Sequence, residues 1–173
     1  MPSISVRHMK PEDVPGVVNL HSRVFPDMLS WTAEELAHHL TVFPEGQLVA
    51  VDETGRILGS ASSLIIDWDD YAESAKWSAI TGQGTFNTHN PLGKTLYGAD
   101  MCVDPFARRQ GIGSLFYKAR KRTVQERGLK RLLTGGRIPW YAQVSQEMTA
   151  QEYVAEVVRG KRKDPTLSFQ LAK

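Results

Sequence analysis

One glycine-rich stretch decides the fold prediction: residues 103–116 read VDPFARRQGIGSLF. An apolar strand pattern ends where the stretch begins, a proline turns the chain, and a basic loop leads into a helical pattern. Gly111 and Gly113 let the backbone approach a ligand closely. The free N–H groups of the first helical turn, the helix dipole and the charges of Arg108 and Arg109 all favour an anion. The stretch therefore predicts a site for a pyrophosphate group.

Two other phosphate-binding loops do not match this stretch. A dinucleotide-binding loop needs a third glycine at position 116, which is Phe116 here. A nucleotide-triphosphate loop needs a lysine followed by serine or threonine after its last glycine, and Gly113 is followed by Ser114 and Leu115. A plain alternative is a glycine-capped loop with solvated arginines.

Charge is concentrated around the same loop. Residues 105–137 carry a formal charge of +9, whereas the rest of the chain carries −7 and the whole chain +2. This asymmetry indicates an anionic partner for one part of the chain. Nucleic acid is not expected, because no stacking aromatics accompany these basic residues on an evident sheet face.

Outward from the loop, the periodicity of apolar residues predicts the order β-α-α-β-β-β-α-β-α. The chain contains no internal repeat and no low-complexity tract. One α/β or α+β domain over residues 1–173 is expected. The predicted strands cover residues 3–9, 46–51, 56–66, 96–103 and 129–134, and the predicted helices cover 11–26, 32–44, 111–127 and 145–158, with a last helical piece at 165–171.

Length and composition exclude several classes of protein. A chain of 173 residues with 41 % hydrophobic and 23 % charged residues can bury a core and is not expected to be disordered. Its one cysteine excludes a disulfide framework or a multi-cysteine metal cage within the chain, and no metal site is expected. We find no apolar run of membrane-spanning length and no apolar segment of the signal-peptide kind at the N-terminus, so the expected compartment is the cytoplasm.

The loop Arg108–Gly113 resembles the acetyl-CoA loop of the GCN5-related N-acetyltransferase (GNAT) family, and Val103–Pro105 resembles its usual strand exit. The predicted element order also matches, so the resemblance covers nearly the whole chain. It implies a mixed, mostly antiparallel central sheet flanked by helices. Three further segments, 43–47, 96–100 and 135–139, are similar to the GNAT domain that some bacteria join to a nitrilase-like carbon–nitrogen hydrolase.

The resemblance implies acetyl-CoA as the cosubstrate. Pantetheine would lie along the backbone of the strand before the loop, and a strand N–H near Cys102 or Val103 would polarise the acetyl carbonyl. The pyrophosphate would be held by the loop and the first helical turn. The cofactor-binding residues expected on this basis are Met101, Cys102, Val103, Arg108, Arg109, Gln110, Gly111, Ile112, Gly113 and Ser114.

The resemblance also implies direct attack of an amine on the thioester, which needs a base. Tyr97 and Asp100 on the strand and His89 before it are the candidates, and the two-residue period of a strand predicts opposite faces for Tyr97 and Asp100. Each has a plain structural alternative: a core aromatic, a paired strand carboxylate and a turn residue. The family often protonates the leaving thiolate with a late tyrosine. Phe169 stands there and cannot donate a proton, so Tyr141 is the candidate acid, unless the thiolate leaves unassisted.

The acceptor is expected to be a small-molecule or protein amine. The connection Asp67–Gly93 carries four acidic residues against one lysine, with aromatic residues interleaved, which suits a cationic amine. A solvated loop anchored by its aromatics is the alternative for this segment. A non-catalytic CoA-binding or regulatory module is the alternative function, motivated by Phe169 and the uncertain base.

The family normally continues with two more strands beyond the position of Lys173, so a fold without its C-terminal strand pair is expected. Strand 129–134 would then be an exposed edge, which natural proteins usually cover. Two explanations are open: a homodimer in which a partner subunit covers this edge, or a chain that is a fragment of a longer protein.

Overall fold

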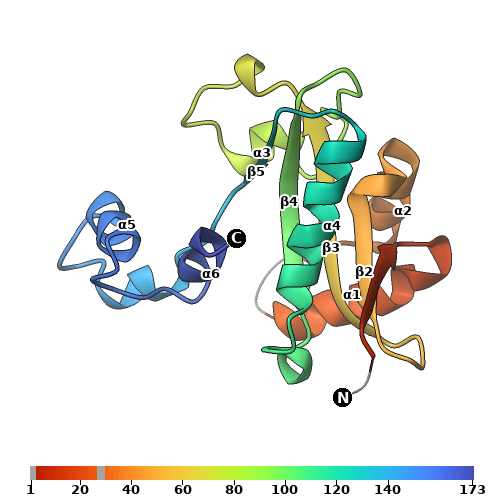
Figure 1. The fold of residues 1–173 in the computed structure, drawn as a ribbon, viewed down its shortest axis with the longest axis horizontal. Coiled ribbons are helices and arrows are strands. Elements are labelled where there is room, and N and C mark those ends of the chain that lie inside the picture. The colour runs from red at the N-terminus through yellow and green to blue at the C-terminus, as the bar shows by residue number, and fades with distance from the viewer. Residues whose placement is uncertain (1–2, 27–29) are drawn as a thin grey trace. The chain divides into compact units, whose positions relative to one another are not determined.

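The computed structural model describes residues 3–26 and 30–173 (Figure 1). Its contacts divide the chain into two compact units, Met1–Thr134 and Gly135–Lys173. The first unit holds the whole sheet and the glycine-rich loop, and the second holds the last helices. That the two units together form a single domain over residues 1–173 stays a prediction.

The first unit is built on one five-stranded sheet with the strand order β1-β2-β3-β4-β5. Neighbouring strands from β1 to β4 are antiparallel, and β5 runs parallel to β4 at the edge of the sheet. This confirms the prediction of a mixed, mostly antiparallel sheet. Cover of the β5 edge by a partner subunit stays a prediction. The strands are β1 (Ser5–His8), β2 (Gln47–Val51), β3 (Ile57–Ile66), β4 (Thr95–Val103) and β5 (Arg131–Thr134).

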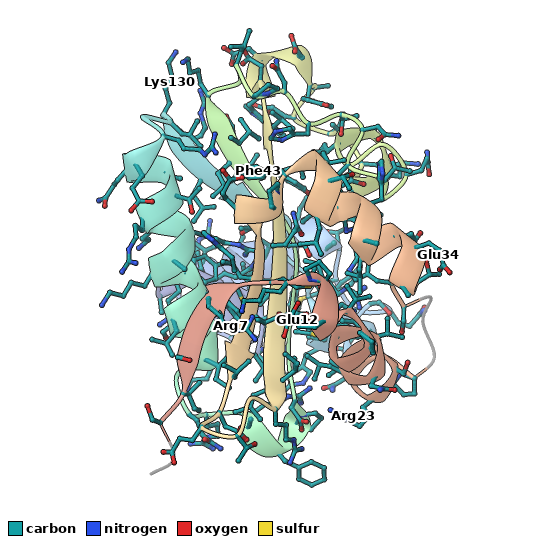
Figure 2. All side chains as sticks on the ribbon, turned by 90° about the vertical axis from the view of Figure 1, so that its right-hand side faces the viewer. Arg7, Glu12, Arg23, Glu34, Phe43 and Lys130 are labelled. Carbon is teal, nitrogen blue, oxygen red and sulfur yellow. The ribbon has the colours of Figure 1, made fainter. Side chains whose placement is uncertain are left out.

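Helices cover both faces of this sheet, as the edge-on view in Figure 2 shows. One face packs against α4 (Ile112–Glu126), whose Ile112 and Phe116 join a core with Ala50 and Ala61 of the strands. The other face packs against α1 (Val14–Val24) and α2 (Ala33–Val42). Successive residues of a strand therefore pack alternately against α4 on one face of the sheet and against α1 and α2 on the other. No helix among the described residues is long and apolar enough to cross a membrane.

The connection between β3 and β4 packs on the face that carries α2. It contains η3 (Trp68–Asp70) and the short helix α3 (Trp77–Ile80), and its Phe86 is fully buried. The indole N–H of Trp77 donates a hydrogen bond of 2.9 Å to the carbonyl of Ala99 in β4. The acidic, aromatic connection is thus fixed to the middle of β4.

A β-bulge in β4 corrects one expectation from the sequence. Ser62 of β3 pairs with Asp100, but the next residue of β3 pairs with Gly98, so Ala99 is an extra residue in β4. Tyr97 pairs with Leu64, two residues from Ser62. Tyr97 and Asp100 consequently lie on the same face of the sheet, and the prediction of opposite faces was wrong.

In the second unit, α5 (Ala150–Val158) and α6 (Leu167–Leu171) follow the single 3-10 segment η5 (Pro139–Gln143). The helix predicted from Ser145 begins later, because Thr149 caps it and forms a capping box with Glu152. Buried Asp164 organises this unit, since its carboxylate accepts hydrogen bonds from the hydroxyl of Tyr153 and the backbone N–H of Trp140.

The close packing at the bulge yields a stability prediction. A Cβ at Gly98 would lie 2.7 Å from Thr134 Cγ2 and 2.8 Å from Arg120 Nη1. We expect Gly98→Ala to lower the free energy of unfolding by about 1–3 kcal/mol, because these neighbours must shift. Urea denaturation measures the change. Arg131→Ala, at an exposed position of β5, is the control and should change stability by less than about 0.5 kcal/mol.

Candidate functional site

The site lies where β4 and β5 separate. Strand β4 pairs with β5 only from Thr95 to Gly98, and β5 ends at Thr134. The remaining residues of β4, from Ala99 to Val103, continue beyond the described pairing with β5. Their backbone groups on that edge can bind an extended ligand that carries amides. The predicted pantetheine-binding residues Met101, Cys102 and Val103 all belong to this segment.

A buried arginine holds this part of the sheet in shape. Arg120 of α4 is 2 % exposed, and its Nη2 donates to the carbonyls of Ser62 at 2.9 Å and Asp100 at 2.6 Å. Its Nε donates to the Ser63 hydroxyl at 3.0 Å. Burial lowers the pKa of Arg120 to about 10, so the group is still charged at neutral pH. A guanidinium with several fixed donors therefore binds both strands across the bulge.

Asp104 anchors the start of the glycine-rich loop. Its Oδ1 accepts a hydrogen bond from the N–H of Phe106 at 3.0 Å, and its Oδ2 lies 3.0 Å from Arg23 and 3.4 Å from Arg56. Burial alone would raise the pKa of Asp104, but the Phe106 hydrogen bond and the Arg23 guanidinium outweigh it and hold the pKa below its usual range. This carboxylate ties α1 and the β2–β3 turn to the exit of β4.

The loop itself has the conformation of an open anion cradle. Arg109 and Gly111 have positive φ angles of 63° and 84°, and the N-cap residue of α4 is Gly111, which has no side chain of its own to cap the helix. A Cβ at Gly111 would meet nothing within 4 Å, so this glycine is not packed against other parts of the described chain. The side chains of Arg108, Arg109 and Gln110 are exposed, whereas that of Ile112 is buried in the core. Gly113 and Ser114 lie in the first turn of α4.

A polar cluster that the sequence did not predict lies on the face of β4 that packs against α1, opposite the face that carries α4. His21 of α1 is buried, and its Nε2 is 3.0 Å from the Ser60 hydroxyl and 3.4 Å from Asp100 Oδ2. The Ser60 hydroxyl is in turn 3.4 Å from Cys102 Sγ. In the sequence, His21 occupies a position on the apolar face of its helix. A histidine at such a position is not specific evidence for a catalytic role.

The pKa values of the cluster follow from its burial. Burial lowers the pKa of His21, although the Asp100 carboxylate acts in the opposite direction. Burial, and secondarily Asp100, raises the pKa of Cys102 to about 12. At neutral pH the imidazole is therefore uncharged and the thiol protonated. A protonated thiol is a poor nucleophile, so Cys102 is not suited to form a covalent intermediate.

Of the other base candidates, Tyr97 shares a face with Asp100 and His89 does not adjoin it. Burial raises the pKa of Tyr97, whose ring packs with Leu64. His89 Nδ1 accepts a hydrogen bond from the backbone N–H of Ile65. The carbonyl of Ile65 in turn accepts a hydrogen bond from the N–H of Asn90, the residue after His89. Both backbone groups of one strand residue point to the same side, so His89 lies on the edge of β3 that faces away from β4.

Tyr141, the candidate acid, belongs to the second unit. Its hydroxyl donates a hydrogen bond of 3.1 Å to the carbonyl of Met148, and its ring packs against Tyr153. Phe169 lies in α6 of the same unit. The role of Tyr141 therefore stays a prediction, as does the expectation that the chain holds no metal.

Comparisons with known proteins identify relatives of this chain. The family model described as "Acetyltransferase (GNAT) family" matches residues 14–141. "Uncharacterized N-acetyltransferase YkwB" of Bacillus subtilis is 35 % identical over 98 % of this chain and 76 % of its own length. "Probable hydrolase YhcX" of the same organism is 43 % identical over 96 % of this chain, which spans 32 % of that protein. The likeness to GNAT domains next to nitrilase-like hydrolases stays a prediction.

A solved structure with the same fold is described as "GphF GNAT-like decarboxylase in complex with isobutyryl-CoA". It superposes with a TM-score of 0.80 at 25 % identity, over 97 % of this chain and 84 % of its own. The structural match confirms the predicted fold class. It also shows that a related protein binds an acyl-CoA.

The Asp104 network yields a prediction with a pH dependence. We expect Asp104→Asn to lower the free energy of unfolding by about 2 kcal/mol at pH 7, because the carboxylate there accepts charge-assisted hydrogen bonds. A lowered pKa in the folded state means that this contribution is complete above the pKa of the unfolded chain and is lost as the pH falls through the folded value. Urea denaturation at pH 7 and pH 3 should show the gap between the two proteins narrowing with acid. A gap that widens at pH 3 would contradict the assignment.

Proposed function

The chain belongs to the acetyltransferase (GNAT) family, and from this premise we propose that it transfers an acetyl group from acetyl-CoA to a primary amine by direct attack. Membership of the family supports an acyl-CoA-dependent N-acyltransferase in general. Because the chain spans only 32 % of one curated relative, the activity of any longer protein that contains it is part of the proposal. The observation that carries the proposal is the separation of β4 from β5 beside the N-terminus of α4, whose N-cap residue is Gly111.

The donor binds along β4 and at the loop. Pantetheine amides pair with the backbone of Met101, Cys102 and Val103, beyond the end of the β5 pairing. The pyrophosphate is held by the N–H groups from Arg109 to Ser114, where the dipole of α4 favours negative charge. Exposed Arg108 and Arg109 add two charges beside it. The thioester carbonyl is then polarised by a strand N–H near Cys102 or Val103.

Asp100 is the base that the geometry favours. Its side chain is 22 % exposed. Asp100 follows the extra residue of the bulge and lies just beyond Gly98, where the pairing of β4 with β5 ends. Tyr97 has a pKa raised by burial and so holds its proton at neutral pH, while His89 is engaged with β3. Asp100 can therefore accept the proton that the amine loses on attack. Tyr141 remains the proposed donor to the leaving thiolate, and the alternative is an unassisted departure.

The acceptor is a cationic amine in this proposal. Residues 67–93 carry Asp67, Asp69, Asp70 and Glu73 against Lys76. The Trp77 hydrogen bond to Ala99 keeps this acidic segment beside β4. Opposite charge near the reacting groups attracts an ammonium ion before it is deprotonated.

A second candidate function is decarboxylation of a carboxylated acyl-CoA. The specific observation that favours it is the TM-score of 0.80 to a GNAT-like decarboxylase. Such a reaction uses the same donor site but keeps the thioester intact and needs no amine. A non-catalytic CoA-binding module is the remaining alternative.

A matched pair of glycine variants tests the donor site. Gly111 and Gly128 lie at opposite ends of α4, both have positive φ and neither has an atom within 4 Å of an added Cβ. Gly111→Glu should weaken acetyl-CoA binding about a hundredfold or more, because a carboxylate then faces the pyrophosphate. Gly128→Glu should bear a similar backbone strain and bind acetyl-CoA normally. Isothermal titration gives both dissociation constants, and equal binding by the two variants would refute the loop assignment.

Product analysis separates the candidate functions. We expect free thiol to be released from acetyl-CoA in the presence of a panel of primary amines, and not in their absence. A decarboxylase would instead release carbon dioxide from malonyl-CoA and leave the thioester whole. Binding of acetyl-CoA with neither product would indicate the non-catalytic module.

A further inference from the structure

His21 is buried against the middle of β4 and contacts the proposed base. The imidazole Nε2 lies 3.4 Å from Asp100 Oδ2, and the side chain of His21 is 4 % exposed where that of Asp100 is 22 % exposed. Asp100 can thus reach a substrate, whereas His21 can reach it only through Asp100. The two residues are 79 positions apart and come from α1 and β4.

We propose that His21 is a positioning residue that receives the amine proton from Asp100, so that the two side chains act as one proton acceptor. This inference rests on the proposed acyl transfer and adds the route that the proton takes. A carboxylate alone is a weak base for an amine, because its ordinary pKa is about 4. An imidazole next to it raises the proton affinity of the pair toward the working pH.

The hydrogen bonds of the cluster fit an imidazole that is ready to accept a proton. Cys102 has a pKa of about 12 and is a thiol, so its S–H can donate to the Ser60 hydroxyl. The Ser60 O–H can then donate to His21 Nε2, which leaves that nitrogen unprotonated in the resting state. When Nε2 gains a proton, it donates to Asp100 Oδ2 instead.

Charges around His21 favour this transfer. Within residues 3–26 and 30–173, Asp100 is the charged group that acts on the pKa of His21, and it favours the imidazolium. Arg23, on the same helix, is held by Asp104. Cys102, from β4, belongs to the same cluster through Ser60, and it is uncharged. An imidazolium formed here therefore meets a carboxylate and no adjacent cation among these residues.

The step balances without another reactant. The bound ammonium ion first gives one proton to solvent. The neutral amine nitrogen then forms a bond to the thioester carbon, the C–S bond breaks, and CoA leaves as a thiolate. The proton released from the nitrogen goes to the Asp100 carboxylate and on to His21 Nε2. Solvent removes it after product release and restores the neutral imidazole.

The first test measures the coupling without any substrate. The imidazole signal of His21 is titrated by NMR in the wild-type protein and in Asp100→Asn. We expect the pKa of His21 to fall further in the variant, because the carboxylate that favours its charged form is gone. Equal pKa values in the two proteins would overturn the proposal, whatever reaction the protein catalyses.

The second test measures the consequence for catalysis. In His21→Gln we expect kcat to fall about tenfold or more, with KM for acetyl-CoA unchanged, and the acidic limb of the pH profile to move to lower pH because Asp100 then acts alone. His8→Gln, at an exposed position of β1, is the control and should leave kcat and the profile unchanged.

The outcomes of the two tests can be told apart. A kcat that falls equally at every pH in a folded His21→Gln protein would show a structural role and overturn the proposal. If wild-type protein releases no thiol with any amine, the proposed function fails, and the NMR titration still decides whether the titrations of His21 and Asp100 are coupled. A changed KM for acetyl-CoA would place His21 in donor binding instead.

Discussion

The site depends on a buried guanidinium that bridges a bulge. Arg120 donates to the carbonyls of Ser62 and Asp100, which pair with each other directly beside the extra residue in β4. Backbone carbonyls at a bulge lose their regular partners, and a buried carbonyl without a donor costs free energy. The guanidinium stabilises the irregular register and so fixes the face on which Asp100 lies. Without that register, Asp100 would not adjoin His21.

Local patterns in the sequence were sufficient for the framework and for the donor loop. Helical periodicity and the glycines at 111 and 113 are properties of neighbouring residues, so the start of α4 followed from them. The family resemblance supplied the direction of the strands. Element ends were less well determined: Ser145 lies before α5 in the chain, but Thr149 forms the capping box that starts the helix.

The reacting side of the site could not be predicted, because it depends on contacts between distant segments. Nothing near Ala99 marks a bulge, since the extra residue is defined by how β3 pairs with it. His21 and Ser60 looked like members of apolar segments, and only the packing of α1 on the sheet brings them to Asp100 and Cys102. His89 shows the converse: its position before the strand suggested chemistry, yet its ring is bound to the backbone of Ile65.

Helix α4 links the two ends of this arrangement. Gly111 is the N-cap residue at the loop, and Arg120 lies nine residues further along, about 14 Å at the rise of an α-helix. Because both residues belong to one regular helix, the distance between the loop and the guanidinium is fixed. The same helix thus positions the proposed anion site at one end and, through its hydrogen bond to the carbonyl of Asp100, the proposed proton acceptor further along.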